Sequence, residues 1–484
     1  TIGSSQTLTV TGTLTNNAGN AGLVIKSDAT GTGSLITTSS PSSTVERYMS
    51  KDNYHYISSP VASQAISTEF INTSGGGTLP SEIDFYTWDE TQLNSWINIK
   101  QADFTLNPAF ETNFGVCKGY VYANSSSAVT KNFTGTLNSG DKTVTLTKSP
   151  LGQRGWNMVG NPFASSVAVN VSADATNNLL TLNTASLNDS REAIYLWNQT
   201  TPNTSTHTTN EYLAINQASP ATFLSPGQAF MVSASANSVS FSLPQAARKH
   251  GSATFYKSGT EDEVNRFWLT VEGPQNNFNE TMVALIPGTT NGMDAGYDAQ
   301  KLKGNVNIAL YTRLVDGSEG DYAIQSIDQL SGNFVVPVGL DANLTGNYTF
   351  KSGRMDNLEA VTVQLEDRNS GTFTTLSNGG EYSIAVGTKG TINNRFFLHL
   401  KSTVGIDDPA NQEASSIYAY GNQLYIQNPG KATLEVYSMT GQRVMASQIN
   451  TTGLYQATLS QPTGYYVVRL TNAGSTQVSK VFIK

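Results

Sequence analysis

Residues that could support catalysis or bind a metal are few and scattered in this sequence. The four histidines, His55, His207, His250 and His399, lie far apart, and none belongs to a closely spaced zinc-binding pair. The chain has no Gly-x-Ser-x-Gly motif, and its one cysteine, Cys117, is not part of a nucleophile and base pattern. We therefore predict a protein that is not an enzyme, with structural or surface histidines and a buried Cys117.

Carboxylates could still do chemistry, because a glycosidase needs only two acids about 5 to 9.5 Å apart. Asp84, Asp89 and Glu90 lie at the ends of predicted strands or in turns, where acids are usually solvated. We do not assign them to catalysis.

Two acidic loops offer oxygen ligands for calcium. They are Asp294-Ala-Gly-Tyr-Asp298 and Asp316-Gly-Ser-Glu-Gly-Asp321, and neither has the spacing of an EF-hand. Aspartates also close turns through the nearby backbone, which explains both loops without a metal. We predict no cofactor; if calcium binds, the candidate ligands are Asp294, Asp298, Asp316 and Asp321.

Tryptophans could bind a glycan by stacking on sugar rings. The five are Trp88, Trp96, Trp156, Trp197 and Trp268. Trp88 and Trp197 occupy matched positions of an internal duplication, so conserved packing also explains them. Trp96 and Trp88 are therefore the candidate glycan contacts, with packing as the alternative.

The composition predicts strands and turns. Charged residues make up 13% of the chain, against roughly 25% in ordinary soluble proteins, and 42 of the 484 residues are glycine. The formal charge of -8 is spread without a block of one sign, which argues against nucleic acid as a partner. No apolar run approaches the roughly 20 residues that span a bilayer, and we expect any signal peptide to lie before Thr1.

The fold class we predict is all-β, with tandem β-sandwich domains of the jelly-roll or Ig-like kind and a possible N-terminal β-solenoid fragment. Residues 1–43 form strand-and-turn units of about a dozen residues, as in a solenoid. They either end a longer repeat region or dock on the next domain.

Residues 44–150 and 151–249 are predicted to be two copies of one β-domain. Three landmarks recur in the same order: His55-Tyr-Ile-Ser-Ser-Pro60 matches Asn157-Met-Val-Gly-Asn-Pro162, Phe85-Tyr-Thr-Trp88 matches Ile194-Tyr-Leu-Trp197, and Lys118-Gly-Tyr-Val121 matches Gln228-Ala-Phe-Met231. The copies are either two domains or two halves of one.

Residues 250–402 are predicted to form a further sandwich. Its end strands, Arg266-Phe-Trp-Leu269 and Arg395-Phe-Phe-Leu-His-Leu400, are both apolar, which suggests that they are neighbours. Residues 403–416 are a polar linker suited to proteolysis. Residues 417–484 alternate in polarity, which predicts a small terminal sandwich.

Four motifs of this terminal segment stand in a fixed order. They are Leu434-Glu-Val-Tyr437, Gly441-Gln-Arg-Val444, Gly464-Tyr-Tyr-Val-Val-Arg-Leu470 and Lys480-Val-Phe-Ile-Lys484. In them the segment resembles the type A C-terminal domain of type IX secretion substrates, with Gly441, Gly464, Tyr466, Arg469 and Lys480 as the motif residues. We expect Gly441 and Gly464 to lie in turns and Lys480 to be an exposed strand residue. The resemblance implies export through the type IX translocon, binding of residues 417–484 by an outer-membrane β-barrel shuttle protein, and cleavage within 403–416 by a surface sortase.

The preceding region resembles a domain of large surface proteins and adhesins from the same bacteria. The motifs are Asn279-Glu-Thr-Met-Val283, Thr290-Asn-Gly-Met-Asp294, Val336-Pro-Val-Gly-Leu340 and Leu365-Glu-Asp-Arg368. We therefore expect a non-catalytic protein, secreted or held on the outer face of the outer membrane, with an adhesive or structural role and a glycan or host surface as a possible ligand. The alternatives are a glycan-binding part of a larger polysaccharide-degrading protein and a subunit of a surface filament or layer.

Overall fold

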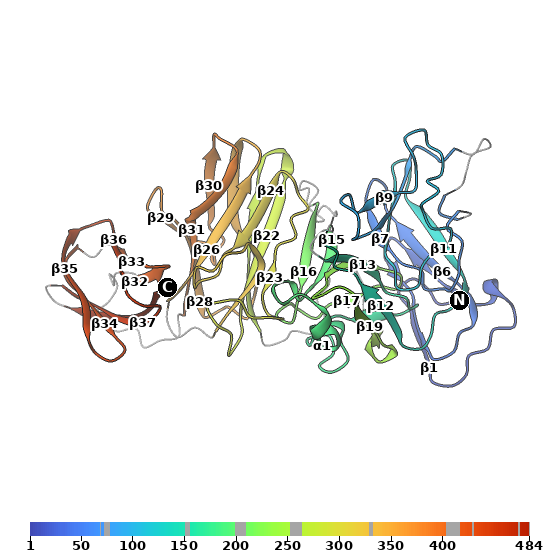
Figure 1. Ribbon diagram of the computed structural model, residues 1–484, viewed down its shortest axis with the longest axis horizontal. Coiled ribbons are helices and arrows are strands. Elements are labelled where there is room, and N and C mark those ends of the chain that lie inside the picture. The colour runs from blue at the N-terminus through green and yellow to red at the C-terminus, as the bar shows by residue number, and fades with distance from the viewer. Residues whose placement is uncertain are drawn as a thin grey trace. The chain divides into compact units, whose positions relative to one another are not determined.

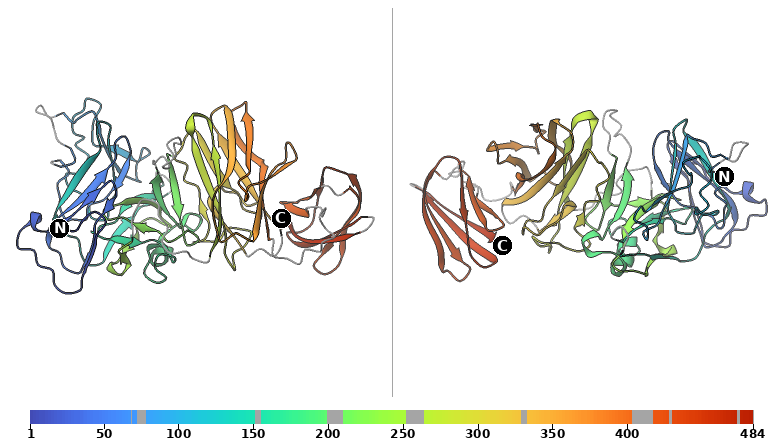
Figure 2. Two further views of the ribbon diagram at one scale, coloured as in Figure 1. Left: turned by 180° about the vertical axis from the view of Figure 1, so that it is seen from behind. Right: turned by 45° about the horizontal axis from the view of Figure 1, so that its top comes forward.

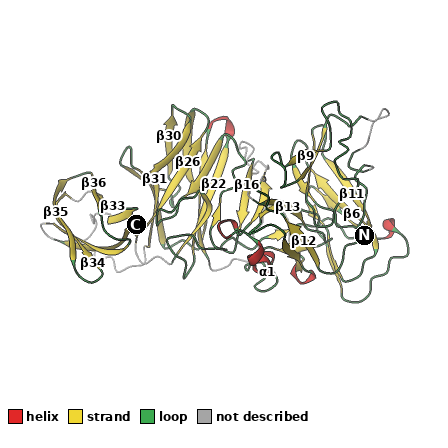
Figure 3. Ribbon diagram, in the orientation of Figure 1, coloured by secondary structure: helices red, strands yellow, loops and turns green. Residues whose placement is uncertain are grey.

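The computed structural model describes residues 1–67, 69–71, 78–150, 155–198, 210–251, 264–328, 333–402, 417–427, 430–472 and 475–483. Strands dominate these residues, and the α-helix α1 (Leu179–Asn183) is short (Figure 3). The all-β prediction is confirmed. No helix of the described residues is long and apolar enough to cross a membrane.

The chain divides into two compact units, which Figure 1 colours along the sequence. The first comprises Thr1–Asn203, Thr209–Glu263 and Ala295–Gly304, and the second comprises Thr204–Thr208, Val264–Asp294 and Asn305–Lys484. The predicted linker 403–416 and His207 lie outside the described residues.

The N-terminal strands of the first unit stack in parallel. The pairs are β1 (Thr7–Val10) with β5 (Ser34–Thr37), and β2 (Val24–Ile25) with β6 (Ser42–Met49). Ile2 also bridges Ile25 in parallel. Such stacking of successive passes of the chain is the arrangement of a β-solenoid. Ile2, Ile25 and Leu35 share a buried core with Val45, so these strands dock on the domain that follows them.

Two antiparallel sheets of the first unit have the same strand order. One contains β7 (His55–Ile57), β8 (Ile83–Trp88), β9 (Trp96–Asn98) and β10 (Tyr120–Asn124), and the other contains β13 (Trp156–Gly160), β15 (Ile194–Asn198), β16 (Glu211–Ile215) and β18 (Ala229–Ser233). In space, each sheet runs first, fourth, second, third strand. The landmarks that match in the sequence therefore lie on corresponding strands.

The two sheets meet through matched positions. Ile57 forms a β-bridge with Gln228, and Val159 forms one with Lys118. Because Ile57 matches Val159 and Lys118 matches Gln228, the contact is reciprocal, like that across a two-fold axis. Both sheets lie in one compact unit.

The pairing of β12 (Lys142–Leu146) differs from the predicted division at residue 150. This strand pairs with β19 (Val239–Leu243), just as β6 pairs with β11 (Val129–Thr136) in the first copy. It belongs with the second copy, which starts near residue 142. The partner of a strand is set by distant residues, so the local pattern could not show this.

Residues 295–304 also depart from the predicted division, because they lie in the first unit and not with the sandwich of 250–402. Asn216 Nδ2 donates to the carbonyl of Tyr297 at 2.6 Å. Lys301 Nζ lies 3.3 Å from Glu211 Oε2, and both side chains are buried. These polar contacts hold the segment in that unit.

The second unit contains a β-sandwich built from one long path of strands. In spatial order they are β29 (Thr372–Thr375), β28 (Val361–Asp367), β31 (Gly390–Ser402), β26 (Asn333–Ala342), β24 (Ile308–Thr312), β25 (Tyr322–Ile327), β22 (Phe278–Leu285), β21 (Asn265–Glu272), β27 (Gly346–Asp356) and β30 (Glu381–Val386). The predicted end strands β21 and β31 are not paired neighbours, since four strands of this path separate them. Both are apolar because Leu269 and Leu398 point into one shared core.

Residues 417–483 form two sheets (Figure 2). They have a hydrophobic core of their own. The first sheet has the order β32 (Ile417–Tyr420), β33 (Gln423–Gln427), β36 (Leu454–Thr458), and the second has the order β35 (Arg443–Thr451), β34 (Gly430–Ser438), β37 (Gly464–Asn472), β38 (Thr476–Ile483). Within the described residues, these strands pair with one another and with no strand of the sandwich. Leu424, Leu434 and Val468 are fully buried between the sheets. We call this part the tail module.

Candidate functional site

The sheet β35-β34-β37-β38 of the tail module has one buried face and one outer face, as strand alternation requires. Along β37, Tyr466, Val468 and Leu470 point into the core, while Tyr465 and Arg469 are exposed. Of the predicted motif residues on this strand, Tyr466 therefore lies in the core and Arg469 lies on the outer face.

Two of the motif residues, Gly441 and Tyr466, have structural roles. Gly441 has φ +84° in the turn between β34 and β35, where the amide of Ser438 donates to the carbonyl of Gln442. A side chain is disfavoured at such a φ, so the predicted turn role of Gly441 fits. Gly464 is instead the first residue of β37, outside the left-handed region, so its predicted turn role is wrong. Tyr466 is buried and donates its hydroxyl to the carbonyl of Pro462 at 2.8 Å.

The outer face carries the other two motif residues beside apolar groups. Glu435 accepts from Arg443 at 2.8 Å and lies 3.8 Å from Arg469 Nη1. The hydrogen bond from Arg443 lowers the pKa of Glu435. Lys480 Nζ lies 4.0 Å from the ring centroid of Tyr465, which is 46% exposed. Arginine and aromatic residues such as Arg469 and Tyr465 are enriched in protein interfaces.

A second group of residues joins the tail module to the sandwich, and sequence reasoning missed it as a site. We call it the tail junction; it consists of Glu366, Arg368, Phe397 and His399 from the sandwich and Tyr418 and Tyr425 from the tail module. In β31, Phe396, Leu398 and Leu400 point into the sandwich core. Phe397 therefore points to the opposite face, where it packs with Tyr418 and Tyr425. The signal in the sequence was an apolar residue on each face of one strand.

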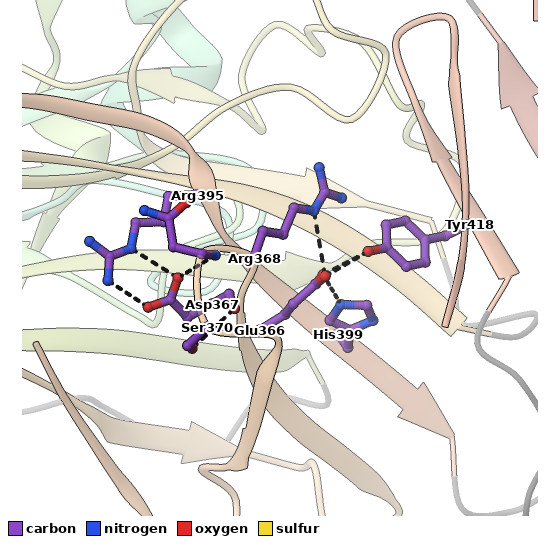
Figure 4. Close-up of polar contacts among 8 residues, drawn as sticks. Glu366, Asp367, Arg368, Ser370, Arg395, His399 and Tyr418 are labelled. Atoms are coloured by element: carbon purple, nitrogen blue, oxygen red, sulfur yellow. Dashed lines mark hydrogen bonds and ion pairs between the residues drawn. The ribbon is translucent and has the colours of Figure 1, made fainter. Parts of the chain in front are cut away.

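Glu366 is the centre of the tail junction (Figure 4). Its carboxylate accepts the hydroxyl of Tyr418 at 2.8 Å and lies 2.8 Å from Nε2 of His399 and 3.5 Å from Nε of Arg368. Burial acts to raise the pKa of Glu366, but the hydrogen bonds and charges of His399, Arg368 and Tyr418 outweigh it, and the pKa is lowered. The buried carboxylate is therefore held charged.

Aromatic stacking completes the tail junction. The guanidinium carbon of Arg368 lies 3.3 Å from the ring centroid of Phe397 and 3.8 Å from that of Tyr425. The rings of Tyr418 and Tyr425 stack at 5.2 Å with an interplanar angle of 13°. Next to Glu366, the buried Asp367 accepts hydrogen bonds from both Nε and Nη2 of Arg395, which fixes the end of β28 against the middle of β31 (Figure 4).

The candidate glycan tryptophans lie in an aromatic cluster of the first unit. Trp88 donates Nε1 to the carbonyl of Trp156 at 2.6 Å, which ties the two copies together. Trp96 is half-buried, with its ring edge-on to Trp88 at 4.9 Å and near Tyr86 at 6.3 Å. The matched Trp197 stacks on Tyr56 of the other copy. Packing accounts for Trp88; both rings are half-buried, and Trp96 remains the candidate glycan contact.

Two of the four candidate calcium ligands accept hydrogen bonds within their own turns. Asp294 accepts from Thr290, and Asp316 accepts from Ser318, as in ordinary turns. Asp298 is buried in the first unit, whereas Asp316 and Asp321 lie in the second. Among the described residues, no three His, Cys, Asp or Glu side chains gather to hold a metal.

Of the three acids that we did not assign to catalysis, Glu90 is buried and not solvated. Glu90 accepts from the amides of Ser149 and Gly155 at 2.7 and 3.0 Å, so it ties the first copy to the backbone of the second. Cys117 is buried as predicted, and burial raises the pKa of its thiol to about 12. Its role is therefore apolar packing.

Comparison with known families identifies the tail module as an export domain. The family model of the secretion system C-terminal sorting domain matches residues 420–484, so the chain is a type IX secretion substrate. The chain itself belongs to the family described as "Domain of unknown function (DUF8693)", whose model matches residues 1–400. No curated protein matches the sequence.

Two solved structures show distant similarity. The adhesin domain of Epf from Streptococcus pyogenes is 10% identical and aligns with 46% of this chain and 92% of its own, with a TM-score of 0.13. The BSP domain of a biofilm associated protein is 9% identical and aligns with 91% of this chain and 92% of its own, with a TM-score of 0.19. Neither similarity carries an argument about function.

Proposed function

We propose that this chain is a non-catalytic protein of the outer face of the outer membrane, with an adhesive or structural role. The observation that carries the proposal is the tail module, which has its own core and an outer face where Arg469 and Lys480 adjoin exposed apolar residues. The remaining strands form binding or spacing domains. The shared strand order of the two sheets in the first unit supports their origin by duplication.

Export requires that the outer-membrane machinery binds a folded surface. We propose that the β-barrel shuttle binds the outer face of β35-β34-β37-β38 and that the sortase cuts between residues 403 and 416. An exposed face with cations and aromatic rings offers both charge and apolar contact to such a partner.

Secretion assays test this proposal. A chain that ends at residue 402 should stay in the periplasm of the native host, and immunoblots of the cell fractions and the medium measure this. Arg469→Glu with Lys480→Glu should reduce export while the purified module stays folded, because both side chains are exposed. Lys389→Glu, an exposed lysine of the sandwich, is the matched control. Normal surface delivery of the truncated chain would refute the proposal.

A second candidate function is glycan binding through the aromatic cluster of the first unit. The observation in its favour is that Tyr54 is 37% exposed and adjoins Tyr86, which in turn adjoins the half-buried Trp96. These rings pack edge to face, and neighbouring aromatic side chains of this kind offer apolar area with polar edges. Pull-down on insoluble polysaccharides should lose the Trp96→Ala variant and retain Trp268→Ala, which changes a tryptophan of the second unit. Absence of binding by the unaltered chain would leave the adhesive or structural role alone.

A further inference from the structure

The sandwich has buried polar and aromatic residues on a face that lies outside its own core. Glu366, Phe397 and His399 lie on the face of β28 and β31 opposite to the sandwich core, and each is at most 3% exposed. In a lone sandwich, this face would meet water. Residues of β32 and β33 in the tail module cover it.

We propose that this face of the sandwich is a specific receptor for the tail module, which it holds without help from the peptide chain between them. A cut between residues 403 and 416 then leaves the tail module bound. Release requires a further event that breaks the tail junction. The inference does not rest on the export role, because it concerns the affinity of two parts of one purified chain.

Charge and hydrogen bonding make the contact specific. Tyr418 places its hydroxyl 2.8 Å from both carboxylate oxygens of Glu366. Without the tail module, Glu366 would lose this donor. A partner that lacks a donor at this position would leave a buried charge under-bonded, which costs more than an exposed polar contact gains.

Arg368 and the aromatic residues of the contact have the composition of a binding hot spot. Arg368 lies between Phe397 of the sandwich and Tyr425 of the tail module, within 4 Å of both ring centroids. Tyrosine and arginine in a desolvated centre carry much of the energy of many protein interfaces. The same residues act here across two modules that have separate cores.

In the part of the chain that the structure describes, the tail module and the sandwich each have complete sheets without strands from the other. The strands of the tail module pair with one another, and those of the sandwich do the same, within the described residues. The contact between them is made by side chains and not by a shared sheet. Such an interface can separate and re-form as a binding equilibrium.

The test uses the full chain with a specific protease site inserted between residues 403 and 416. After complete cleavage, verified on a denaturing gel, size-exclusion chromatography separates bound from free tail module. We expect the fragment to co-elute with the body of the chain. Tyr418→Phe should weaken binding about tenfold or more, because it removes a hydrogen bond to a charged group, and Arg368→Ala should release the fragment.

Two matched variants control for general effects. Tyr465→Ala changes an exposed tyrosine on the outer face of the tail module, and Arg354→Ala changes a half-exposed arginine of the sandwich. Both should leave co-elution unchanged. Circular dichroism of the released fragment checks that it remains folded. A folded tail module that elutes alone from the cleaved, unaltered chain would overturn the proposal, as would Arg368→Ala chains that bind like the unaltered one.

Discussion

Ser58 and Gly160 occupy matched positions of the two copies, and they face each other where the copies meet. A Cβ added at Gly160 would lie 2.2 Å from both Cβ and Oγ of Ser58 and 3.0 Å from the carbonyl oxygen of Lys118. The Cβ of Ser58 cannot move without its backbone. Gly119 and its match Ala229 meet in the same way, since an added Cβ at Gly119 would lie 2.9 Å from that of Ala229. Residues near a two-fold axis meet their own counterparts, and in both of these pairs the backbones approach so closely that one member is glycine.

Gly160→Ala should therefore destabilise the first unit strongly. Overpacking of a tight core typically costs 1 to 3 kcal/mol, and we expect about 3 kcal/mol because the clash involves fixed atoms. For a unit of this size, each kcal/mol lowers the melting temperature by about 2 to 4 °C, which gives a decrease of about 6 to 12 °C.

Thermal unfolding followed by tryptophan fluorescence measures this decrease. Four of the five tryptophans lie in the first unit, so the signal reports mainly on that unit. Gly12→Ala is the control, because an added Cβ there has no atom within 4 Å. If Gly160→Ala melts within about 1 °C of this control, the copies do not meet as described and the reciprocal contact is wrong.

Three further predictions concern the tail module and the single cysteine. Gly441→Ala should destabilise the isolated tail module by about 1 to 2 kcal/mol in urea, because φ there is +84°; Gly464→Ala should have little effect, since its added Cβ would lie 4.0 Å from the nearest atom. Acid should release the cleaved tail module. The folded pKa of Glu366 lies below its ordinary value of 4.5, since His399 and the other partners outweigh the effect of burial, so its contribution is complete above 4.5 and is lost as the pH falls further; chromatography at pH 7 and at about pH 3 compares the two states. Cys117 should react with a thiol reagent only after unfolding, and equal rates in native and denatured protein would contradict its burial.

The alternation of polarity predicted much of the tail module. Leu434 and Val436 are fully buried, whereas Glu435 lies on the outer face, as the period of two requires. Gly441 was correctly placed in a turn because glycine is favoured at positive φ. Gly464 was not, because glycine also occurs at strand ends for reasons that a single sequence does not reveal.

Predictions that depended on distant partners were less successful. The pattern of β12 shows a strand, but its pairing with β19 instead of an earlier strand depends on the whole second copy. Glu90 was expected to be solvated at a strand end. It is instead buried, and it accepts hydrogen bonds from two amides of the second copy. In each case the missing information was which distant segment covers the residue.

The strand β31 shows how a sequence can indicate that a distant segment covers one face of a strand. A strand with one wet face should alternate apolar and polar residues, but Arg395-Phe-Phe-Leu-His-Leu400 places Phe397 on the side away from the sandwich core. A phenylalanine there would lose the benefit of burial, about 2 kcal/mol or more, if that side met water. Arg368 of the sandwich together with Tyr418 and Tyr425 of the tail module buries it completely, which removes that loss. The position of Phe397 therefore suits a sandwich that binds the tail module. A sandwich that was only linked to a removable sorting domain would not need an apolar residue there.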